Sequence, residues 1–558
     1  MFMNWQRELV AYQIYPRSFN DSNGDGIGDL QGVIEKLDYL KDLGIDLIWV
    51  SPIYKSPNDD NGYDISDYKD ILQEFGSMED FDNLLKEVHN RGMYLIMDLV
   101  INHTSDEHPW FSEAKSSKDN PKRDWYIWKK GKESIDGEDN VEPNNWESIF
   151  GGSAWEYDDN SDEYYLHLFS KKMPDLNWEN QDMRNALYEM INWWIDKGID
   201  GFRVDAISHI KKCDYDDMPN ADNLRYVSSF DKQMNQPGIE ILLEDLKEHT
   251  FDKYDRFTIA EASGVNKDDL KKWTGNENGK FSMIFQFEHM NLWENDNFKK
   301  PLLIDLKNIL SRWQDTIYKD GWIALFLENH DLTRIVSKLG DEKKYWKESA
   351  KALALMYFMQ MGTPFIYQGQ EIGMTNADYN SINDFDDVVT LYKYKESIEN
   401  GIPEGEALAL VKATARDNSR TPMQWNSKDD GGFTTGTPWI KVNENYKRIN
   451  VEDELKDDDS ILNFYKEMIK IRKENRTLIY GKYNLILREH DKIYAYTRTL
   501  NNEKYIIITN LSEENVKFDY EEEKLKYKGL LLSNYKIYEH EDVTDFILRP
   551  YEARIYKL

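Results

Sequence analysis

Eight short apolar runs divide the chain up to residue 368, and each is followed by a longer stretch with apolar residues at helical spacing. Such runs, rich in Val, Ile and Phe, are typical of buried strands, and their alternation with helices predicts a parallel sheet. Eight strands close a (β/α)8 barrel, so we predict an α/β protein with this TIM-barrel fold. The predicted strands are Ala11–Tyr15, Asp46–Val50, Tyr94–Val100, Gly201–Val204, Thr258–Ala260, Met283–Phe287, Ile323–Leu327 and Phe365–Gln368, and the predicted helices include Asp80–Asn90 and Met183–Lys197.

Two regions interrupt this alternation. Residues 104–172, after the third predicted strand, are polar, rich in Trp and without clear periodicity, which makes them too long for a simple loop. From about residue 480 the chain changes to short alternating segments such as KIYAYTRTL and KYIIITNL, typical of an antiparallel sheet. We therefore predict a barrel formed by residues 1–103 and 173–479, an inserted subdomain B at 104–172, and a C-terminal β-sandwich at 480–558. The charged segment Glu521–Lys526 predicts a solvated turn.

The charge of the chain restricts its partners. Lys and Arg total 70 whereas Asp and Glu total 103, which gives a formal net charge of −33. A charge of this sign repels nucleic acid and anionic membranes and favours a neutral or cationic ligand, so a small oligosaccharide or disaccharide fits.

The single cysteine and the absence of a long apolar segment indicate in which cellular compartment the protein works. Cys213 is the single cysteine, which excludes an intrachain disulfide and a Cys-based zinc site. The opening residues MFMNWQRELVAYQIYPRSF lack the pattern of a signal peptide, and no stretch approaches the roughly 20 apolar residues of a membrane span. We expect a cytoplasmic protein without a membrane partner, either a monomer or a weak homo-oligomer.

Polar residues stand where four of the predicted strands end. The carboxyl ends of barrel strands meet on one face and supply the catalytic groups of such folds. A single Asp at a strand end is most often a helix cap, but four strands ending in carboxylates or imidazoles argue for a shared site. The strand ends read DLVINH with Asp98, Asn102 and His103, GFRVDA with Arg203 and Asp205, IAEA with Glu261, and LENHD with His330 and Asp331.

Two of these carboxylates suit the cleavage of an acetal. That reaction needs one carboxylic acid to protonate the leaving oxygen and one carboxylate on the other side of the anomeric carbon. Arg203 lies two residues before Asp205 on the same strand face and would hold it ionised, as a nucleophile requires. Glu261 has a longer side chain, and an apolar environment would raise its pKa and keep it protonated. Asp331 could bind sugar hydroxyls or favour a positive charge on the sugar.

A metal-dependent reaction is the alternative, because His103, His330 and the carboxylates could also ligate a cation. The chain contains no His-Glu-x-x-His element and no pair of histidines at helical spacing, however. Metal-independent acid–base chemistry is therefore the favoured interpretation.

The segments DLVINH, GFRVDA, AEA and ENHD, in this order and spacing, resemble the four sequence regions of the α-amylase family, glycoside hydrolase family 13. The similarity extends along the whole chain, and SPNDDNGYDISDY, YYLHLFSKKMPDLNWEN and ARDNSRTPMQW resemble its α-glucosidase and oligo-1,6-glucosidase branch. The resemblance implies a retaining mechanism in which Asp205 is the nucleophile, Glu261 the acid/base and Asp331 a stabiliser of the transition state.

The resemblance also implies which residues hold the first sugar. These residues are Asp60, Tyr63, His103, Phe169, Arg203, His330 and Arg416. Tyr63 and Phe169 correspond to its stacking walls, and Asp60 and Arg416 to a pair that grips the hydroxyls of the non-reducing end. Taken alone, this last pair would be read as ordinary surface charges. Such a clamp closes the site into a pocket, which implies exo action on short chains.

A second candidate site lies after the first predicted strand. The loop carries oxygen side chains at alternating positions around Gly26, an arrangement suited to a hard cation, although an EF-hand would require Glu where Gly32 stands. A plain Gly/Asp turn is the alternative. The resemblance to the α-glucosidase branch, in which this loop binds calcium, favours a structural and not a catalytic Ca²⁺. The ligands would be Asp21, Asn23, Asp25, Asp29 and the carbonyl oxygen of Ile27.

Two positions bear on the linkage that is cleaved. In the resembling branch a Val after the nucleophile accompanies α-1,6 preference and a smaller residue accompanies α-1,4 preference, and this chain has Ala206. The smaller side chain leaves more room for the leaving sugar. Met173 replaces the Gln that is usual in oligo-1,6-glucosidases. We therefore expect an exo-acting α-glucosidase that prefers α-1,4 links, as in maltose and malto-oligosaccharides, with possible transglucosylation.

Three alternatives remain beside this expectation. The first is an oligo-1,6-glucosidase acting on isomaltose-type links. The second is a sucrose isomerase or glucosyl transferase, although the segment LTRIVSKLGDE lacks the Arg-rich loop of sucrose isomerases. The third is a non-catalytic relative, which would require a membrane segment and lost carboxylates, and the sequence shows neither.

Overall fold

A computed structural model describes residues 5–133, 141–254, 256–294, 302–520, 528–537 and 545–558. The predicted turn at Glu521–Lys526 lies outside the described residues. Within the described part of the chain, no helix combines the length and the apolar character that crossing a membrane requires.

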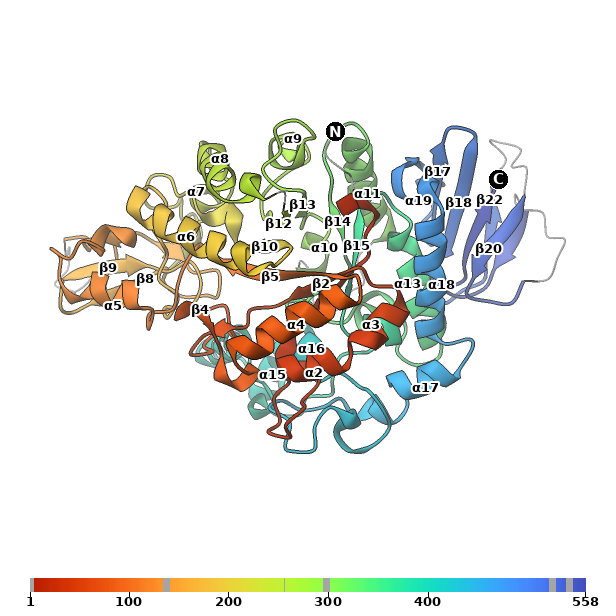
Figure 1. Ribbon diagram of the computed structural model, residues 1–558, viewed down its shortest axis with the longest axis horizontal. Coiled ribbons are helices and arrows are strands. Elements are labelled where there is room, and N and C mark those ends of the chain that lie inside the picture. Colours follow the sequence, from red (N-terminus) through yellow and green to blue (C-terminus); the bar gives the residue numbers. More distant parts are fainter. Residues whose placement is uncertain (1–4, 134–140, 255, 295–301, 521–527, 538–544) are drawn as a thin grey trace.

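A parallel eight-stranded barrel forms the centre of the molecule (Figure 1). All neighbouring strand pairs are parallel, and a further parallel bridge between Ile284 and Ile323 joins the two end strands of the sheet. The predicted barrel and its eight strands are confirmed. In spatial order the strands are β13 (Met283–Phe285), β12 (Phe257–Glu261), β10 (Gly201–Asp205), β5 (Tyr94–Val100), β2 (Leu47–Val50), β1 (Ala11–Ile14), β15 (Thr363–Tyr367) and β14 (Ala324–Leu325).

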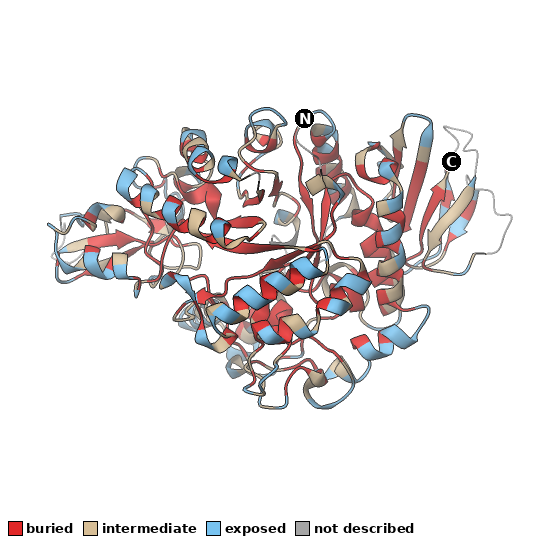
Figure 2. Cartoon of the chain, in the orientation of Figure 1, coloured by how far each residue is buried: buried red, intermediate tan, exposed pale blue. Residues whose placement is uncertain are grey.

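Helices surround the barrel and expose their polar faces (Figure 2). Helix α4 begins at a reciprocal cap between Ser77 and Asp80 and buries apolar residues one turn apart. The longer helices are α4 (Met78–Asn90), α6 (Gln181–Lys197), α8 (Ile239–His249), α11 (Leu303–Ile317), α13 (Trp346–Phe358), α14 (Val388–Glu399), α15 (Glu404–Thr414) and α18 (Ile461–Glu474). Shorter ones include α2 (Leu30–Glu35), α3 (Leu37–Leu43), α5 (Pro109–Ser116), α16 (Asp417–Arg420), α17 (Val451–Lys456) and α19 (Arg476–Tyr480).

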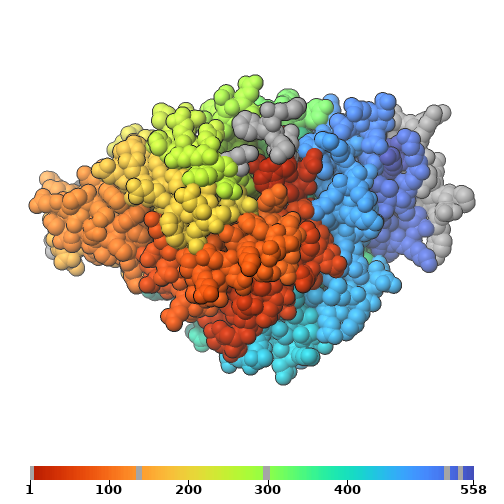
Figure 3. All heavy atoms as spheres, in the orientation of Figure 1, coloured from red at the N-terminus to blue at the C-terminus, as the bar shows by residue number. Residues whose placement is uncertain are grey.

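The region between β5 and α6, orange in Figure 3, lies at one end of the molecule. It contains a small three-stranded antiparallel sheet (Figure 1). Its strands are β6 (Trp128–Lys129), β8 (Trp155–Asp158) and β9 (Glu163–Leu166). A fourth strand, β7 (Trp146–Glu147), pairs in parallel with β11 (Val227–Ser228), which follows the barrel strand β10. Two segments about 80 residues apart along the chain are thus joined through their main chains, which the sequence analysis did not predict.

The C-terminal part of the chain forms two antiparallel sheets that pack on each other. Apolar residues of both sheets, including Ile486, Ile506, Phe518 and Leu548, make a core separate from that of the barrel. The predicted antiparallel domain is confirmed. One sheet has the order β16 (Lys482–Ile486), β17 (Ile493–Leu500), β18 (Glu503–Asn510), β22 (Ala553–Lys557) and β20 (Gly529–Ser533), and the other consists of β19 (Val516–Asp519) and β21 (Asp545–Leu548).

Two buried arginines lie at the junction of this domain and the barrel, where both donate to the carbonyl oxygen of Leu478. Arg472 in α18 donates to the carbonyl oxygens of Phe358 and Gly362, at 2.6 Å each. Arg498 in β17 donates to the carbonyl oxygens of Gly481 at 3.0 Å and Leu478 at 2.8 Å. Several of these carbonyl groups lie at helix ends, such as that of Phe358 at the end of α13, and the arginines supply hydrogen-bond donors that buried carbonyl groups need.

The loop that follows β1 is ordered by its own acidic residues. The Asp21 carboxylate accepts backbone hydrogen bonds from Asn23 at 3.0 Å, Gly24 at 2.7 Å and Gly26 at 2.8 Å. Asp29 caps α2 by accepting the amide of Gly32 at 2.6 Å. Among the described residues no group of three or more His, Cys, Asp or Glu side chains could by itself hold a metal ion. Calcium in this loop stays a prediction, and it would need amide and backbone oxygens, which calcium accepts.

We expect chelation to lower the melting temperature and added calcium to restore it, because an ion that binds only the folded state stabilises it by mass action. The activity measured at once after chelation should be unchanged, since the loop lies outside the cluster of strand-end carboxylates. Calorimetric scans with EGTA and with excess calcium measure this response. Asp25→Ala removes an exposed oxygen that otherwise accepts only the amide of Ile27 and should abolish the response. Identical scans with and without calcium would identify the loop as a hydrogen-bonded turn.

Candidate active site

The carboxyl ends of the barrel strands bring the predicted strand-end residues together. Asp98 lies in β5, Asp205 ends β10 and Glu261 ends β12, and these three strands are direct neighbours in the barrel. In the β5–β10 pairing, Arg203 lies opposite Asp98. His330 and Asp331 follow β14.

One guanidinium group links three carboxylates at this face. Nη1 of Arg203 lies 2.6 Å from Oδ1 of Asp98 and 2.5 Å from Oδ1 of Asp205. Its Nη2 lies 2.9 Å from Oε2 of Glu261. Arg203 and Asp98 are fully buried, and Asp205 and Glu261 are largely buried. Asp205 and Glu261 are therefore held side by side by the same cation.

This sharing changes the expected charge of Asp205. Burial raises the pKa of Asp205, and Glu261 and Asp98 raise it further, while Arg203 lowers it. Burial also raises the pKa of Asp98 to about 6 in spite of Arg203. The expectation that Arg203 would simply hold Asp205 ionised is wrong, because three acids share its one positive charge. Such a cluster favours keeping a proton among its members.

Glu261 differs from the expectation in its surroundings. Its Oε2 accepts the backbone amide of Ala206 at 2.7 Å in addition to its contact with Arg203. The predicted apolar environment is thus wrong, and the carboxylate faces a donor and a cation. Ala206 has a left-handed backbone, with φ 44° and ψ 26°, which is uncommon for a residue with a side chain and is found at functional sites. This conformation is the one in which the Ala206 amide reaches Glu261.

A neutral histidine connects the predicted sugar-binding residues. Nε2 of His330 lies 2.6 Å from the Tyr63 hydroxyl and 3.1 Å from Oδ2 of Asp331, and its Nδ1 faces the amide nitrogen of Gln13 at 2.8 Å. Burial lowers the pKa of His330 to about 3, so the imidazole is uncharged near neutral pH. The Tyr63 hydroxyl also donates to Asp98 at 3.1 Å. The structure therefore places Tyr63 and His330 next to the Arg203 cluster.

A second cluster surrounds Arg416. Its Nη2 lies 2.7 Å from Asp60, its Nη1 3.2 Å from Asp331, and its Nε and Nη2 lie 2.9 and 2.6 Å from Oδ1 of Asp387. Arg420 adds a further contact to Asp331 at 2.9 Å. The predicted Asp60–Arg416 pair is thus a buried ion pair and not a surface contact.

The charges around Asp331 and Asp387 decide their ionisation. Burial alone would raise the pKa of Asp331, but the charges of His330, Arg416 and Arg420 outweigh it and hold the pKa well below its usual range. Since His330 is uncharged near neutral pH, the arginines account for this effect. Burial likewise opposes ionisation of Asp387, and Arg416 again prevails. Both carboxylates are therefore negative at neutral pH.

Sequence reasoning missed two residues of this cluster. Arg420 lies four residues after Arg416, one helical turn away, and that spacing inside ARDNSRTPMQW was an available signal. Asp387 stands before helix α14 and accepts the amides of Val389 and Thr390. In the sequence it looks like a helix cap, and only the fold shows that it also binds Arg416.

Aromatic rings line the opposite part of the site. The ring of Phe169 lies 5.1 Å from that of His103 and 5.4 Å from that of Phe150, measured between centroids. The guanidinium of Arg416 lies 5.1 Å from the Phe150 ring centre. Nε2 of His103 lies 3.2 Å from the backbone oxygen of Tyr63, and burial lowers the pKa of His103 to about 4. All the predicted sugar-binding residues thus belong to one contiguous set, to which Phe150 is added.

Comparison with known proteins agrees with this arrangement. The family model described as "Alpha amylase, catalytic domain" matches residues 13–481, and the one described as "Alpha-amylase SusG C-terminal domain" matches residues 493–555.

Similar proteins extend over the whole chain. It is 54% identical over 553 residues to "Probable oligo-1,6-glucosidase 3" of Bacillus subtilis (strain 168), covering 99% of each chain. It is 51% identical over 563 residues to "Oligo-1,6-glucosidase" of Parageobacillus thermoglucosidasius, again covering 99% of each. The crystal structure of a trehalose-6-phosphate hydrolase variant from Bacillus licheniformis superimposes with a TM-score of 0.93 at 44% identity, covering 99% of both chains. With this coverage, the protein belongs to the α-amylase family, glycoside hydrolase family 13.

Proposed function

We propose that this glycoside hydrolase is an exo-acting, retaining α-glucosidase that releases glucose from the non-reducing end of short α-1,6-linked glucosides. The observation that supports this mechanism is that Asp205 and Glu261 both contact the guanidinium group of Arg203, which holds the two acids close together. Retaining glycosidases need two carboxyl groups that lie close together: one attacks the anomeric carbon as the nucleophile, and the other acts first as general acid and then as general base.

The proposed reaction has two steps. Asp205 attacks the anomeric carbon while Glu261 gives its proton to the glycosidic oxygen, so that the carbon–oxygen bond breaks and the leaving alcohol departs. Glu261, now a carboxylate, then takes a proton from water, and the water oxygen displaces Asp205 from the anomeric carbon. The first step needs one carboxylate and one carboxylic acid, and three buried acids around the single cation of Arg203 favour retaining one proton among them.

Asp331 and the Arg416 cluster have different proposed roles. Asp331 is negative and would stabilise the positive charge that develops on the sugar in the transition state. Asp60 and Arg416 would bind hydroxyls at the non-reducing end, with Asp387 fixing the guanidinium in place. A buried ion pair at this point limits the site to one terminal glucosyl unit, which supports exo action.

The α-1,6 preference replaces the sequence-based expectation of α-1,4 links. Both oligo-1,6-glucosidases share more than half of their residues with this chain. The argument from Ala206 is weak in comparison, because one methyl-scale difference in a pocket contributes only about 1–3 kcal/mol. Met173 adds little, since its side chain is buried in the core. A small residue next to the nucleophile permits an α-1,4 link without requiring one.

The two carboxylates can be told apart by azide rescue. We expect Asp205→Ala and Glu261→Ala each to lower kcat at least about a hundredfold. On an activated aryl α-glucoside, azide should restore turnover in both variants. The Glu261 variant should give the α-glucosyl azide, because the covalent intermediate still forms, and the Asp205 variant should give the β-glucosyl azide. Proton NMR of the products measures the configuration.

Asp98→Asn is the matched control for this experiment. It alters the same Arg203 cluster, so its activity should fall, but azide should not restore it because Asp98 contacts no reacting atom in the proposed mechanism. The opposite pair of azide configurations would exchange the two assignments. Near-normal turnover of Glu261→Ala on isomaltose would refute its role altogether.

The role of Asp387 can be tested by Asp387→Asn. The change removes the charge that accepts two hydrogen bonds from Arg416, so we expect kcat/KM to fall at least about tenfold, as for a broken buried ion pair. The loss should extend to α-glucosyl fluoride, since the clamp acts on the glucosyl unit itself. The control is Asp378→Asn, which breaks an exposed pair with Lys412. Equal kcat/KM in both variants would show that Asp387 only caps its helix.

The linkage assignment predicts the order of substrates. We expect kcat/KM for isomaltose to exceed that for maltose by about tenfold or more. Chromatography of the products from isomaltose, maltose, sucrose and trehalose 6-phosphate measures this order and also reveals transfer or isomerisation. A higher value for maltose would return the assignment to α-1,4 links, and isomaltulose formed from sucrose would indicate an isomerase.

A further inference from the structure

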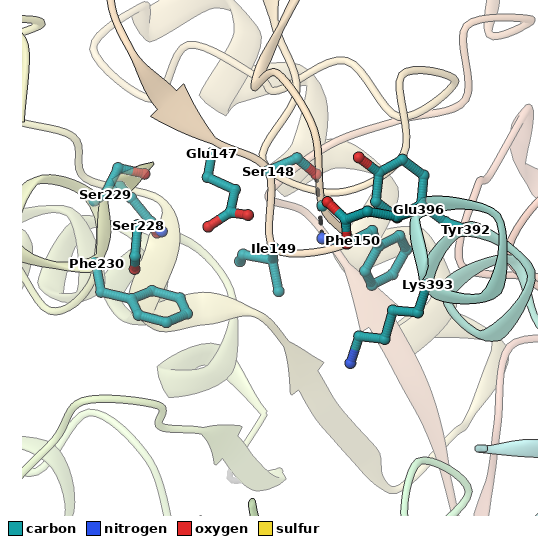
Figure 4. Close-up of a pocket in the computed structure, with 12 residues that line it drawn as sticks. Glu147, Ser148, Ile149, Phe150, Ser228, Ser229, Phe230, Tyr392, Lys393 and Glu396 are labelled. Atoms are coloured by element: carbon teal, nitrogen blue, oxygen red, sulfur yellow. Dashed lines mark hydrogen bonds between the residues drawn. The ribbon is translucent and has the colours of Figure 1, made fainter. Parts of the chain in front are cut away.

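A cavity of about 210 Å³ lies between three segments that are distant from one another in the sequence (Figure 4). Its walls are the strand and turn around β7, the segment from β11 to the short helix α7 (Phe230–Gln233), and helix α14. Sites for drug-sized ligands measure roughly 300–1,000 Å³, so this cavity suits a smaller molecule. The side chains that decide its chemistry are Glu147, Phe150, Ser229, Gln233, Tyr392 and Glu396.

Two carboxylates without a counter-charge line this cavity. Neither Glu147 nor Glu396 has a side-chain hydrogen bond or an ion pair with another described residue. Burial raises the pKa of Glu147, and the charge of Glu396 raises it further. Lys393, the one cation among the described residues that line the cavity, is exposed and forms no ion pair with either glutamate. A bound cation would supply the charge that this pair of acids lacks.

Aromatic rings lie next to these carboxylates. The rings of Phe150 and Tyr392 both line the cavity. Burial raises the pKa of Tyr392, and the charges of Glu396 and Glu147 raise it further, so the hydroxyl of Tyr392 lies near both acids. Aromatic faces attract cations, and organic ammonium ions in particular are recognised by such rings. A metal ion fits less well, because the described residues contain no group of three His, Cys, Asp or Glu side chains that could hold one.

The wall formed by the segment after β11 presents unused hydrogen-bonding groups. Oγ of Ser229 and Nε2 of Gln233 are buried and form no hydrogen bond within the described residues. Such groups are rare, because a buried polar atom has lost its bonds to water and gained none in return. Figure 4 shows Glu147 between Ser229 and Tyr392, so these groups lie at the other end of the cavity from the Tyr392 ring. A hydroxyl group on the ligand would satisfy both of them.

We propose that this cavity is a binding site for a small organic ammonium ion that bears a hydroxyl group. The ammonium group would lie between Glu147, Glu396 and the rings of Phe150 and Tyr392. The oxygen of its hydroxyl group would accept a hydrogen bond from the Gln233 amide, and the hydroxyl would donate one to Ser229. The net charge of −33 favours the approach of a cation over that of an anion.

Phe150 connects this cavity to the residues proposed to bind the first sugar. Its ring lies 5.4 Å from the Phe169 ring and 5.1 Å from the Arg416 guanidinium. The proposed cation and a glucose molecule would therefore occupy separate sites that share one aromatic ring. We expect both to bind at the same time, and each should change the affinity of the other by the same modest factor. The proposal concerns a ligand that takes no part in the reaction, so it does not rest on the proposed function.

Choline and 3,3-dimethylbutan-1-ol test this proposal, because they share a shape and a hydroxyl group and differ in charge. In titration calorimetry with the unaltered protein, choline should bind about tenfold or more tightly than the uncharged alcohol. The double variant Glu147→Gln/Glu396→Gln should weaken choline binding about tenfold or more and leave the alcohol within about twofold. Glu399→Gln is the matched control and should bind choline like the unaltered protein. Glu399 also acts on Tyr392 but does not line the cavity.

A titration of choline in saturating glucose locates the bound ion. Its affinity should change by no more than about threefold, since the two sites are separate. Loss of choline binding in glucose would place the ion in the first-sugar pocket and overturn the proposal. Equal binding of choline and the alcohol, no binding of choline at all, or full binding by the double variant would overturn it as well. These titrations involve no turnover, so an enzyme that hydrolyses no α-glucoside would refute the proposed function and leave this result intact.

Discussion

The candidate site depends on a single guanidinium, that of Arg203, which contacts carboxylates from three neighbouring barrel strands. The cation and its partners are buried, so removing Arg203 would leave three acids without a counter-charge. This arrangement fixes the separation between Asp205 and Glu261 through the register of β10 and β12 and not through flexible loops. The sheet itself therefore determines where two acids meet a sugar.

The Arg416 cluster repeats this principle at the other end of the site. Here also one buried guanidinium contacts three carboxylates, those of Asp60, Asp331 and Asp387, and Arg420 adds a second cation. Asp331 belongs to this cluster and, through His330, to the Arg203 group. In the more cationic cluster the pKa values of Asp331 and Asp387 are lowered, whereas in the Arg203 group burial outweighs the cation and raises the pKa values of Asp98 and Asp205. Two groups of similar composition thus shift the pKa values of their acids in opposite directions, and the number of nearby cations contributes to this difference.

The barrel, the C-terminal sheets and the meeting of the strand-end residues were predictable, because apolar periodicity and strand order determine them. The protonation of Asp205 and the surroundings of Glu261 were not, because they depend on how many neighbours share one cation. Asp387 was hidden by its second role as a helix cap. The pairing of β7 with β11 joins two-residue strands, which are too short to show any alternation in the sequence. The proposed linkage rests on similarity to relatives over the whole chain and not on the one residue beside the nucleophile.

The pairing of β7 with β11 also bears on how such enzymes exchange parts during evolution. Subdomain B is a single inserted segment when the chain is read in order, yet its strand β7 is hydrogen-bonded to β11, which follows the barrel strand β10. The structural unit formed by β7 and β11 is therefore built from two segments that are not adjacent in the sequence. A chimera that received the insertion from one relative and the segment after β10 from another would combine a β7 and a β11 that come from different proteins. Recombination that preserves this pairing must transfer both segments together.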